Sequence, residues 1–282
     1  MKRHISLQGK TVLITGGSRG IGFATAKAVL RRGARVVITA RDRERLLGAA
    51  RALHEDGRQV FTQTMDVTDA TSVSRGIDEI LAQVGEIDVV VNNAGGATQC
   101  LFVDSSLESL KAELDLNYFG SLCVTKAVLP HMRQRQCGMI VNVASVLGFV
   151  PYPSMANYSA SKAALVRFTE ALNFELRFDG IDVMLFVPGH TDTDAIKHIK
   201  LDGPPVAKPE HVGEHLAAAI CRRLQFAAHG GGNKVLLQLS RFLPRYARYI
   251  LQQMAIKSLP PGTFGAPRQR GHTGPALECS KE

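Results

Sequence analysis

Short apolar runs alternate with longer stretches of helical periodicity along most of the chain. The apolar runs predict buried parallel strands, which we place at 10–15, 35–40, 60–65, 87–91, 139–144 and 181–187. Apolar residues spaced three and four apart predict helices at 23–32, 43–55, 107–136, 157–179 and 208–224. We expect a seventh strand at 234–239. Strands and helices in alternation predict an α/β fold with a doubly wound parallel sheet.

Length and composition agree with this fold and indicate the cellular compartment in which the protein works. The chain has 282 residues, of which 45% are hydrophobic, enough for one large α/β domain or two small ones. No apolar run approaches the ~20 residues that span a bilayer, and residues 1–10 lack the apolar segment of a secretory signal. The five cysteines show no metal-ligand spacing. We therefore expect a cytoplasmic protein with free thiols and no metal site.

A glycine-rich turn joins the first strand to the first helix. Its residues are Gly16, Gly17, Ser18, Arg19, Gly20, Ile21 and Gly22. Glycine lets the backbone approach a ligand, and a helix N-terminus offers free N–H groups and a partial positive charge. The pattern indicates a phosphate cradle for a dinucleotide. The alternative interpretation is an ordinary tight turn.

The end of the second strand indicates which dinucleotide binds. An acidic residue there holds the ribose hydroxyls of NAD, whereas a nearby arginine accommodates the 2′-phosphate of NADP. Here Ala40 is followed by Arg41, and Arg19 and Arg45 could join it. Asp42 is the competing carboxylate, which we interpret as the N-cap of the next helix. The pattern favours NADP(H).

Polar and small residues also follow the next two strands. Asp66 and Val67 follow the third strand, where the carboxylate either hydrogen-bonds the adenine amine or caps the following helix. Asn93 and Gly95 follow the fourth strand, and small or amide residues suit a close approach to a ligand. In doubly wound sheets ligands bind beyond these carboxyl ends.

Tyr158 and Lys162 lie one helical turn apart and project from the same face of a predicted helix. A free tyrosine has a pKa of ~10 and is a poor base at neutral pH. An adjacent ammonium favours the phenolate and lowers this pKa, so the pair could exchange a proton with an alcohol or ketone oxygen. Taken alone, the spacing is more typical of a surface tyrosine beside a solvated lysine.

Together the motifs resemble those of the short-chain dehydrogenase/reductase family. They follow its order and spacing over residues 7–240, and they comprise the glycine-rich turn from Thr15 to Gly22, Asn92–Gly95, Asn117, Ser145, Tyr158 with Lys162, and Pro188-Gly189. The resemblance implies a Rossmann-type domain with a seven-stranded parallel sheet, often a homodimer or homotetramer. It also implies an enzyme that reduces a ketone or oxidises the matching secondary alcohol.

The resemblance assigns roles to individual residues. Tyr158 would be the general acid/base, and Lys162 would lower its pKa and contact the nicotinamide ribose. Ser145 would orient the substrate oxygen, and Asn117 would hold a water that relays protons to Lys162. The alternatives are a strand-end cap for Ser145 and a packing residue inside a helix for Asn117. The predicted cofactor-binding residues are Gly16, Ser18, Arg19, Gly20, Ile21, Gly22, Arg41, Arg45, Asp66, Val67, Asn93, Gly95, Tyr158, Lys162, Pro188, Gly189, Thr191 and Thr193.

Three loops that contact substrate in this family correspond to residues 96–102, 146–157 and 190–205. The middle loop has no charged residue, and its apolar residues include Leu147, Phe149, Val150, Tyr152 and Met155. This favours an apolar or lipid-like ketone such as a 3-oxoacyl group, although loops under a lid are apolar anyway. His190 either contacts polar groups of the substrate or is an ordinary loop residue.

The chain continues beyond the length at which many family members end. The net charge is +9, and from Arg241 onward seven basic residues stand against two acidic ones. Residues 241–257 have apolar side chains at helical spacing, which predicts a basic amphipathic helix. Such a helix either lies on a membrane surface or packs on the domain or a second subunit, and we favour packing. We therefore divide the chain into an NADP-binding catalytic domain at 1–240, a helical extension at 241–259 and a disordered tail at 260–282.

An NADPH-dependent reductase of apolar ketones is the leading hypothesis. One alternative is a reductase of small or cyclic secondary metabolites. Another is a non-catalytic NADP(H)-binding regulator on the same fold, although such proteins typically lose the tyrosine or lysine that this chain keeps. The sequence has no array of aromatic and basic residues of the kind that binds nucleic acid.

Overall fold

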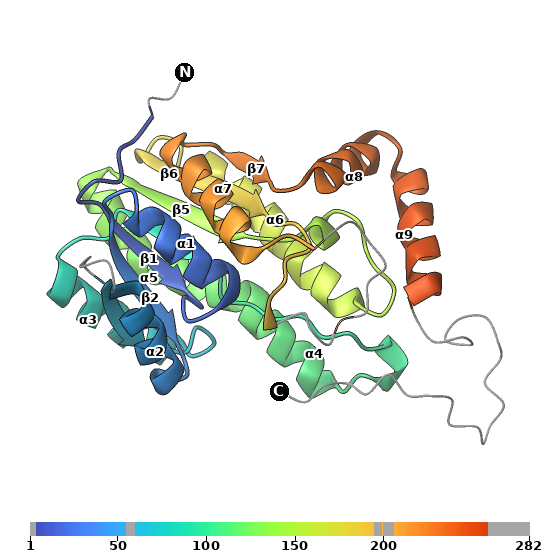
Figure 1. Ribbon diagram of the computed structural model, residues 1–282, viewed down its shortest axis with the longest axis horizontal. Helices are drawn as coiled ribbons and strands as arrows, with labels where there is room; N and C mark the ends of the chain where they lie inside the picture. The colour runs from blue at the N-terminus through green and yellow to red at the C-terminus, as the bar shows by residue number, and fades with distance from the viewer. Residues whose placement is uncertain (1–3, 55–59, 195–198, 200–205, 259–282) are drawn as a thin grey trace.

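A seven-stranded, all-parallel sheet forms the centre of the molecule (Figure 1). The computed structural model describes residues 4–54, 60–194, 199 and 206–258. The strands are β1 (Thr11–Thr15), β2 (Arg35–Ala40), β3 (Val60–Thr64), β4 (Val89–Asn92), β5 (Gly138–Val143), β6 (Ile181–Val187) and β7 (Phe226–Ala228). Their order is β3-β2-β1-β4-β5-β6-β7. It reverses between β1 and β4, where doubly wound sheets bind their ligands.

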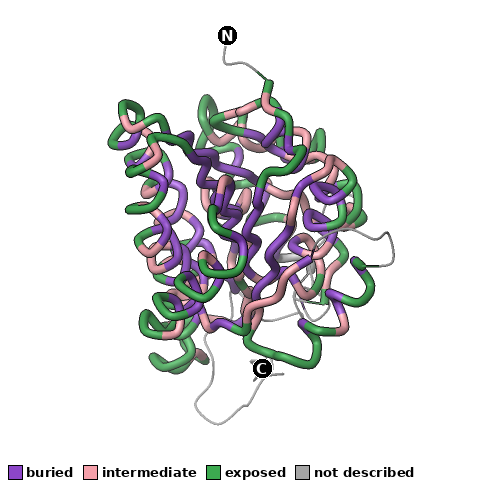
Figure 2. The backbone as a smooth tube through the Cα atoms, turned by 90° about the vertical axis from the view of Figure 1, so that its left-hand side faces the viewer, coloured by how far each residue is buried: buried purple, intermediate pink, exposed green. Residues whose placement is uncertain are grey.

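Helices cover both faces of this sheet, which explains why its central strands are largely apolar. One face packs against α1 (Gly20–Leu30), α2 (Arg43–His54) and α7 (Pro209–Cys221). The other packs against α3 (Ala70–Val84), α5 (Gly120–Arg135) and α6 (Ala156–Glu175). Every residue of β1 and β6 is buried, and Figure 2 shows the buried strands between exposed helix surfaces. The predicted doubly wound α/β fold is confirmed.

The predicted seventh strand at 234–239 is wrong. The sheet ends with the short strand β7, and residues Gly231–Phe242 form helix α8. Leu236 and Leu239 are three positions apart, and both pack against one cluster of buried apolar residues. This spacing is helical, whereas a strand would point alternate residues to opposite faces. Because β7 has only three residues, its apolar pattern is too short to stand out from the sequence.

Helix α9 (Pro244–Ser258) follows α8 after a break at Leu243. The helix expected at 241–257 thus corresponds to the last residues of α8 and to α9, and these two helices lie at one end of the molecule (Figure 1). Ala247, Leu251 and Ala255 of α9 are buried in the apolar cluster that also receives Leu236 and Leu239. The inner face of the pair thus packs on the domain. No helix among the described residues is long and apolar enough to cross a membrane, and the tail at 260–282 lies outside them.

The long helix predicted at 107–136 is interrupted by a π-helical turn. Leu107–Leu114 form α4, Asp115–Phe119 form the π turn, and α5 follows. Such turns occur mainly at functional sites, and this one carries Asn117. The free thiols predicted from the sequence are confirmed at Cys123, Cys137 and Cys221. Cys100 is instead disulfide-bonded, which corrects that prediction.

Gly213 allows α7 to approach α1 closely, and we predict that Gly213→Ala destabilises the protein. The added Cβ would lie 2.5 Å from the backbone carbonyl carbon of Ala24, so the two helices must separate. Overpacking of this kind costs about 1–3 kcal/mol of unfolding free energy, which urea denaturation measures. Gly48→Ala in α2 is the matched control, because its nearest neighbour would be 3.9 Å away. Equal stabilities for the two variants would contradict the interpretation.

Candidate active site

The glycine-rich turn lies after β1, at the point where the strand order reverses. Gly16 and Gly20 have φ angles of +62° and +56°, a region that favours glycine. A Cβ at Gly22 would lie 2.4 Å from the carbonyl oxygen of Gly16, so the turn admits no side chain there. Helix α1 has neither a side-chain cap nor an acidic residue in its first turn. Its first N–H groups are therefore available to an anion, and the turn fits the pyrophosphate of a dinucleotide.

Asn93 fixes this turn to the loop that follows β4. Its Nδ2 donates to the carbonyl oxygens of Thr15 at 3.0 Å and Gly16 at 3.3 Å. In return the Thr15 hydroxyl accepts from the backbone N–H groups of Asn93 and Ala94, both at 3.0 Å. The side-chain amide of Asn93 is thus hydrogen-bonded within the protein. A contact between Asn93 and the cofactor stays a prediction.

The residues expected around the adenosine end lie after β2 and β3. Arg19, Arg41 and Arg45 are all exposed. Asp42 accepts a hydrogen bond from the backbone N–H of Arg45 at 3.0 Å, which confirms it as a helix N-cap. Asp66 accepts from the backbone N–H and hydroxyl of Thr68 at 2.9 and 2.8 Å.

The cap of α3 is Asp69, whose carboxylate accepts from the N–H of Thr71. The alternative role of helix cap for Asp66 is thereby wrong, and its adenine contact stays a prediction. Val67 is buried and packs against Gly120, where an added Cβ would lie 2.7 Å from a Val67 methyl carbon. Ser18 and Ile21 are partly buried, and Ile21 packs against the core.

The segment after β6 crosses the glycine-rich turn. A Cβ at Gly20 would lie 3.0 Å from the methyl carbon of Thr193. Thr191 is buried and donates to the carbonyl oxygen of Gly189 at 2.7 Å. Pro188 and Gly189 therefore bring both threonines toward the predicted dinucleotide site.

Four polar side chains meet beyond β4 and β5. Asn117 is fully buried; its Nδ2 donates to the carbonyl oxygen of Gly96 at 2.8 Å, and its Oδ1 accepts from the Gly96 N–H at 3.0 Å. The Ser145 hydroxyl lies close enough to the Tyr158 phenol to favour its ionised form. Lys162 donates to the carbonyl oxygen of Val143 at 3.1 Å, and its Nζ lies 5.9 Å from the centre of the Tyr158 ring. The structure thus brings together the four residues predicted as catalytic.

Burial dominates the ionisation of this group. It raises the pKa of Tyr158 to about 12, although the nearby Ser145 hydroxyl acts in the opposite direction. Burial also lowers the pKa of Lys162 to about 8, against the charge of Glu113, which raises it. The expected lowering of the tyrosine pKa is therefore wrong for this structure. At neutral pH the phenol is protonated and can donate its proton.

Comparison with known proteins agrees with this geometry. The family model for short chain dehydrogenases matches residues 10–203. The chain belongs to the short-chain dehydrogenase/reductase family. It is an oxidoreductase of the kind that acts on CH–OH and C=O groups.

Two relatives and one solved structure illustrate the similarity. The chain is 35% identical over 219 residues to the 3-oxoacyl-[acyl-carrier-protein] reductase FabG of Chlamydia trachomatis, covering 74% of this chain and 88% of the relative. It is 31% identical to the mouse dehydrogenase/reductase SDR family member 7B over 264 residues, covering 92% and 80%. A gluconate 5-dehydrogenase from Burkholderia cenocepacia, solved with NADP and tartrate, has a TM-score of 0.74 at 27% identity, covering 81% and 96%.

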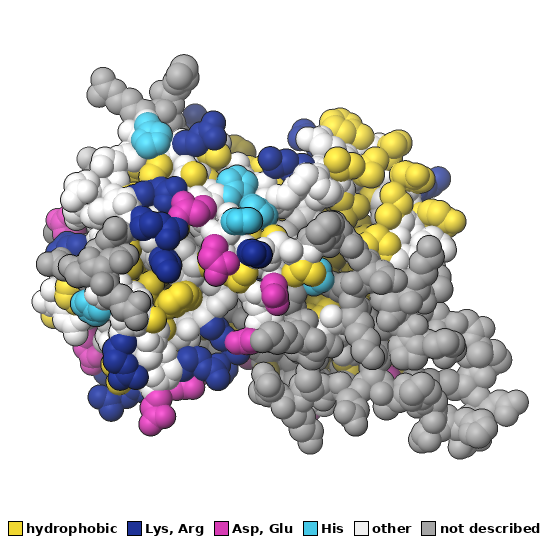
Figure 3. All heavy atoms as spheres, viewed as in Figure 1, with side chains coloured by type: hydrophobic (Ala, Val, Ile, Leu, Met, Phe, Trp, Pro, Cys, Tyr) yellow, Lys and Arg dark blue, Asp and Glu magenta, His cyan; other side chains and the backbone are white. Residues whose placement is uncertain are grey.

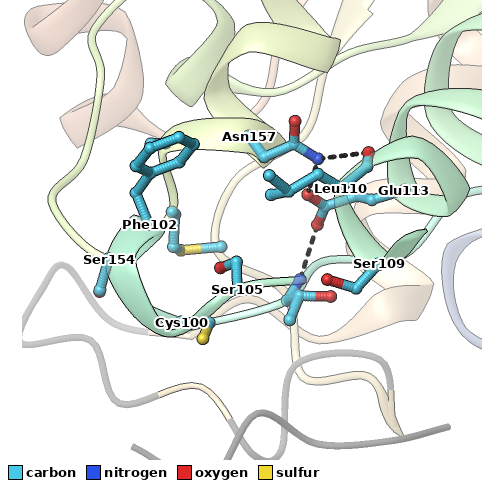
Figure 4. A pocket seen from close by; sticks show the side chains of 11 residues that line it. Cys100, Phe102, Ser105, Ser109, Leu110, Glu113, Ser154 and Asn157 are labelled. Carbon is cyan, nitrogen blue, oxygen red and sulfur yellow. Dashed lines mark hydrogen bonds between the residues drawn. The ribbon is translucent and has the colours of Figure 1, made fainter. Parts of the chain in front are cut away.

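Sequence reasoning missed Glu113, a buried carboxylate beside the site of this short-chain dehydrogenase/reductase. Its oxygens accept from the Thr98 N–H at 2.8 Å and from Asn157 Nδ2 at 2.7 Å (Figure 4). The sequence does carry one signal, because Glu113 precedes Asn117 by four positions and stands between Leu110 and Leu114. The cavity that Glu113 lines has a volume of about 20 Å³, too small for a substrate.

Apolar side chains cover the other side of Tyr158. Leu147, Val150, Tyr152 and Met155 are buried in the cluster closed by α8 and α9, and Tyr158 packs against it. Much of the apolar character of the loop at 146–157 is thus explained by packing under these helices. His190 is half-buried, and burial lowers its pKa.

We predict that Gly95→Ala impairs catalysis more than Gly96→Ala. A Cβ at Gly95 would lie 2.8 Å from Asn117 Oδ1 and 3.3 Å from Lys162 Nζ, so both side chains must shift. Displacement of a catalytic group by 1 Å can cost about 100-fold in rate, and we expect a 10- to 100-fold loss of kcat. At Gly96 the nearest atom would be 3.5 Å away, an ordinary contact. Equal losses in steady-state assays of the two variants would contradict the assignment.

Proposed function

We propose that this protein is an NADPH-dependent reductase of apolar ketones, with Tyr158 as proton donor. The observation that carries the proposal is the meeting of Asn117, Ser145, Tyr158 and the buried Lys162 at one place beyond the strand ends. This arrangement lies beyond the strand ends of a doubly wound sheet, where ligands bind. The bound nicotinamide would supply hydride to the carbonyl carbon.

The protein residues would handle the charge that develops on the substrate oxygen. Ser145 and Tyr158 would both donate hydrogen bonds to that oxygen, and Tyr158 would transfer its proton to it. The Lys162 ammonium would stabilise the phenolate left behind. Asn117, fixed to Gly96, would hold the water that returns a proton through Lys162. A protonated Tyr158 can give its proton to the oxygen that becomes charged when hydride is added, which is the direction of ketone reduction.

The preference for NADP(H) is supported by the charges at the end of β2. Arg41 follows the strand directly, Arg45 lies four residues further on, and Arg19 is in the glycine-rich turn. All three side chains are exposed. Asp42, the competing carboxylate, is engaged as a helix cap. A 2′-phosphate would find cations and no free carboxylate at the strand end. The structural neighbour solved with NADP is consistent with this preference.

An apolar substrate, such as a 3-oxoacyl thioester or a long-chain ketone, is supported by two observations. The cluster that Tyr158 packs against is apolar. The relative from Chlamydia trachomatis is a 3-oxoacyl-[acyl-carrier-protein] reductase. A reductase of small or cyclic metabolites is the alternative, since packing under α8 and α9 also accounts for the apolar loop.

Self-association as a homodimer or homotetramer is supported by apolar side chains on one set of helices. Phe102, Phe119, Phe174 and Phe178 are all exposed in the single chain, Phe178 by 82%. They lie on or next to α4, the π turn and α6. Exposed phenylalanines on these elements would suit a subunit interface, and we propose that such an assembly works in the cytoplasm.

Tyr158→Phe tests the proposed function, with Tyr118→Phe as the matched control. Loss of the proton donor should lower kcat for ketone reduction about 10²- to 10⁴-fold, while the variant still binds NADPH as measured by fluorescence. The wild-type rate should fall as pH rises through about 8, because Lys162 loses its charge there. NADPH should support faster turnover than NADH. Full activity in Tyr158→Phe would contradict the proposal and favour a non-catalytic or different role.

A peripheral membrane contact through the outer face of α8 and α9 would bring the enzyme to an apolar substrate. Phe242, Leu243, Tyr246 and Tyr249 are exposed there, and Figure 3 shows hydrophobic side chains gathered on α8. Residues 231–258 contain no aspartate or glutamate, and the exposed Arg241, Arg245 and Arg248 lie among the apolar residues. Aromatic residues with arginines and no acidic group suit a membrane of anionic lipids.

We predict that the full-length protein sediments with anionic vesicles more than with zwitterionic ones. Replacing Arg241, Arg245 and Arg248 with glutamine should weaken this binding, since each basic residue near an anionic surface contributes about 1 kcal/mol. Three replacements would then lower the partition coefficient roughly 100-fold. The matched control replaces Arg75 on α3, Arg167 on α6 and Arg177 in the turn after α6, which are all exposed. Equal effects of the two triple variants would reject a specific membrane face.

A further inference from the structure

Glu113 is buried in a way that a purely structural residue would not require. Only 8% of it is exposed, and its two oxygens accept one hydrogen bond each, from Thr98 and from Asn157. Among the described residues it forms no ion pair within 4.0 Å. Buried carboxylates are rare and costly unless their charge is compensated. Burial raises the pKa of Glu113, whereas the hydrogen bonds from Thr98 and Asn157 and the positive charge of Lys162 lower it and favour the carboxylate.

The hydrogen bonds of Glu113 lead directly to the catalytic group. Asn157 precedes Tyr158 in the first turn of α6, and its Nδ2 also donates to the carbonyl oxygen of Leu110 at 2.9 Å (Figure 4). Thr98 lies two residues beyond Gly96, the partner of Asn117. Glu113 therefore joins α4 to the start of the helix that carries Tyr158 and to the loop after β4.

Glu113 also stands alone as the buried anion near Lys162. Among the described residues the buried charged side chains are Glu113, Lys162 and Asp182. Asp182 lies near the opposite end of β6 and is paired with Arg223. The charge of Glu113 acts on both Tyr158 and Lys162, raising the pKa of each.

The other charged groups on the elements around Lys162 are exposed or only half-buried. On α4 and the π turn, Glu108, Lys111 and Asp115 are exposed to solvent. On α6, Arg167 is exposed and pairs with Glu170. After β6, His190 is half-buried and feels the charge of Asp192. Because solvent screens exposed charges, Glu113 has a stronger electrostatic effect on the buried Lys162 than these groups have.

We propose that Glu113 is a positioning residue for the reaction: its buried carboxylate fixes Asn157 beside Tyr158 and Thr98 in the loop that Asn117 holds, and its negative charge acts on the side of the site that carries Lys162. The inference rests on the proposed function, in which Tyr158 donates a proton and a charged Lys162 stabilises the phenolate. The length of the Glu113 side chain would position Asn157, and its charge would act on Lys162. These two effects can be tested separately.

Glu113→Gln and Glu113→Asp separate these effects. Glutamine removes the charge and places an amide N–H₂ group against the donor Nδ2 of Asn157. Aspartate keeps the charge but shortens the side chain. The matched control is Glu108→Gln, the same chemical change at an exposed position of the same helix. Each variant is assayed with NADPH and a ketone across pH 5–10 in the full-length protein, and its thermal unfolding is recorded.

Removal of the charge should move the high-pH limb of kcat to lower pH. The charge of Glu113 raises the pKa of Lys162, so without it the lysine deprotonates below its value of about 8. We expect a shift of about 0.5–1 pH unit and a loss of about tenfold in kcat at pH 7 for Glu113→Gln. Glu113→Asp should lose kcat while the limb stays in place, and Glu108→Gln should match the wild type. The KM for NADPH should be unchanged in all three.

A wild-type pH profile in Glu113→Gln, with or without lower thermal stability, would overturn the inference and leave Glu113 as a structural clamp. An equal pH shift in Glu108→Gln would overturn it too, because the effect would then follow net charge. The Tyr158→Phe variant distinguishes failure of the proposed function. If Tyr158→Phe keeps full activity, both proposals fall, whereas an inactive Tyr158→Phe with an unshifted Glu113→Gln removes the inference alone.

Discussion

A lysine ammonium buried beside a tyrosine is the constraint on which the site depends. Only 5% of Lys162 is exposed, and burial of an unpaired charge is strongly unfavourable. The protein compensates with the Val143 carbonyl at the end of β5, the face of the Tyr158 ring and the field of Glu113. These groups come from a strand, the helix itself and α4. The stability of the buried Lys162 charge thus depends on how β5, α6 and α4 are placed relative to one another.

The loop after β4 is the element that conveys this coupling to the predicted cofactor site. Asn93 fixes its first residues to the glycine-rich turn, Asn117 holds Gly96 through both of its backbone groups, and Glu113 holds Thr98. Three polar side chains therefore determine the path of one short segment. A loop fixed in this way supports a precise relation between the dinucleotide and Tyr158, since sites with locked side chains lose little entropy on binding.

Much of the fold and the site could be predicted from local sequence patterns. Most of the strands from β1 to β6 are short, largely apolar runs, and Tyr158 with Lys162 is visible as a helical spacing within a set of motifs. The short strand β7 and helix α8 could not be separated, because three apolar residues carry little periodic signal. The pKa of Tyr158 was predicted in the wrong direction because burial depends on tertiary packing. Glu113 was missed for the same reason: its partners, Thr98 and Asn157, are distant in sequence.

NADPH consumption by the purified wild-type protein, measured against ketones of graded chain length, tests the central claim most directly. The panel extends from short 3-oxo esters to long-chain lipid ketones at constant pH and NADPH concentration. The account predicts turnover with kcat/KM rising with chain length, because each added methylene gains apolar contact of about 0.8 kcal/mol if it is fully buried. NADPH binding without consumption across the whole panel would contradict the account.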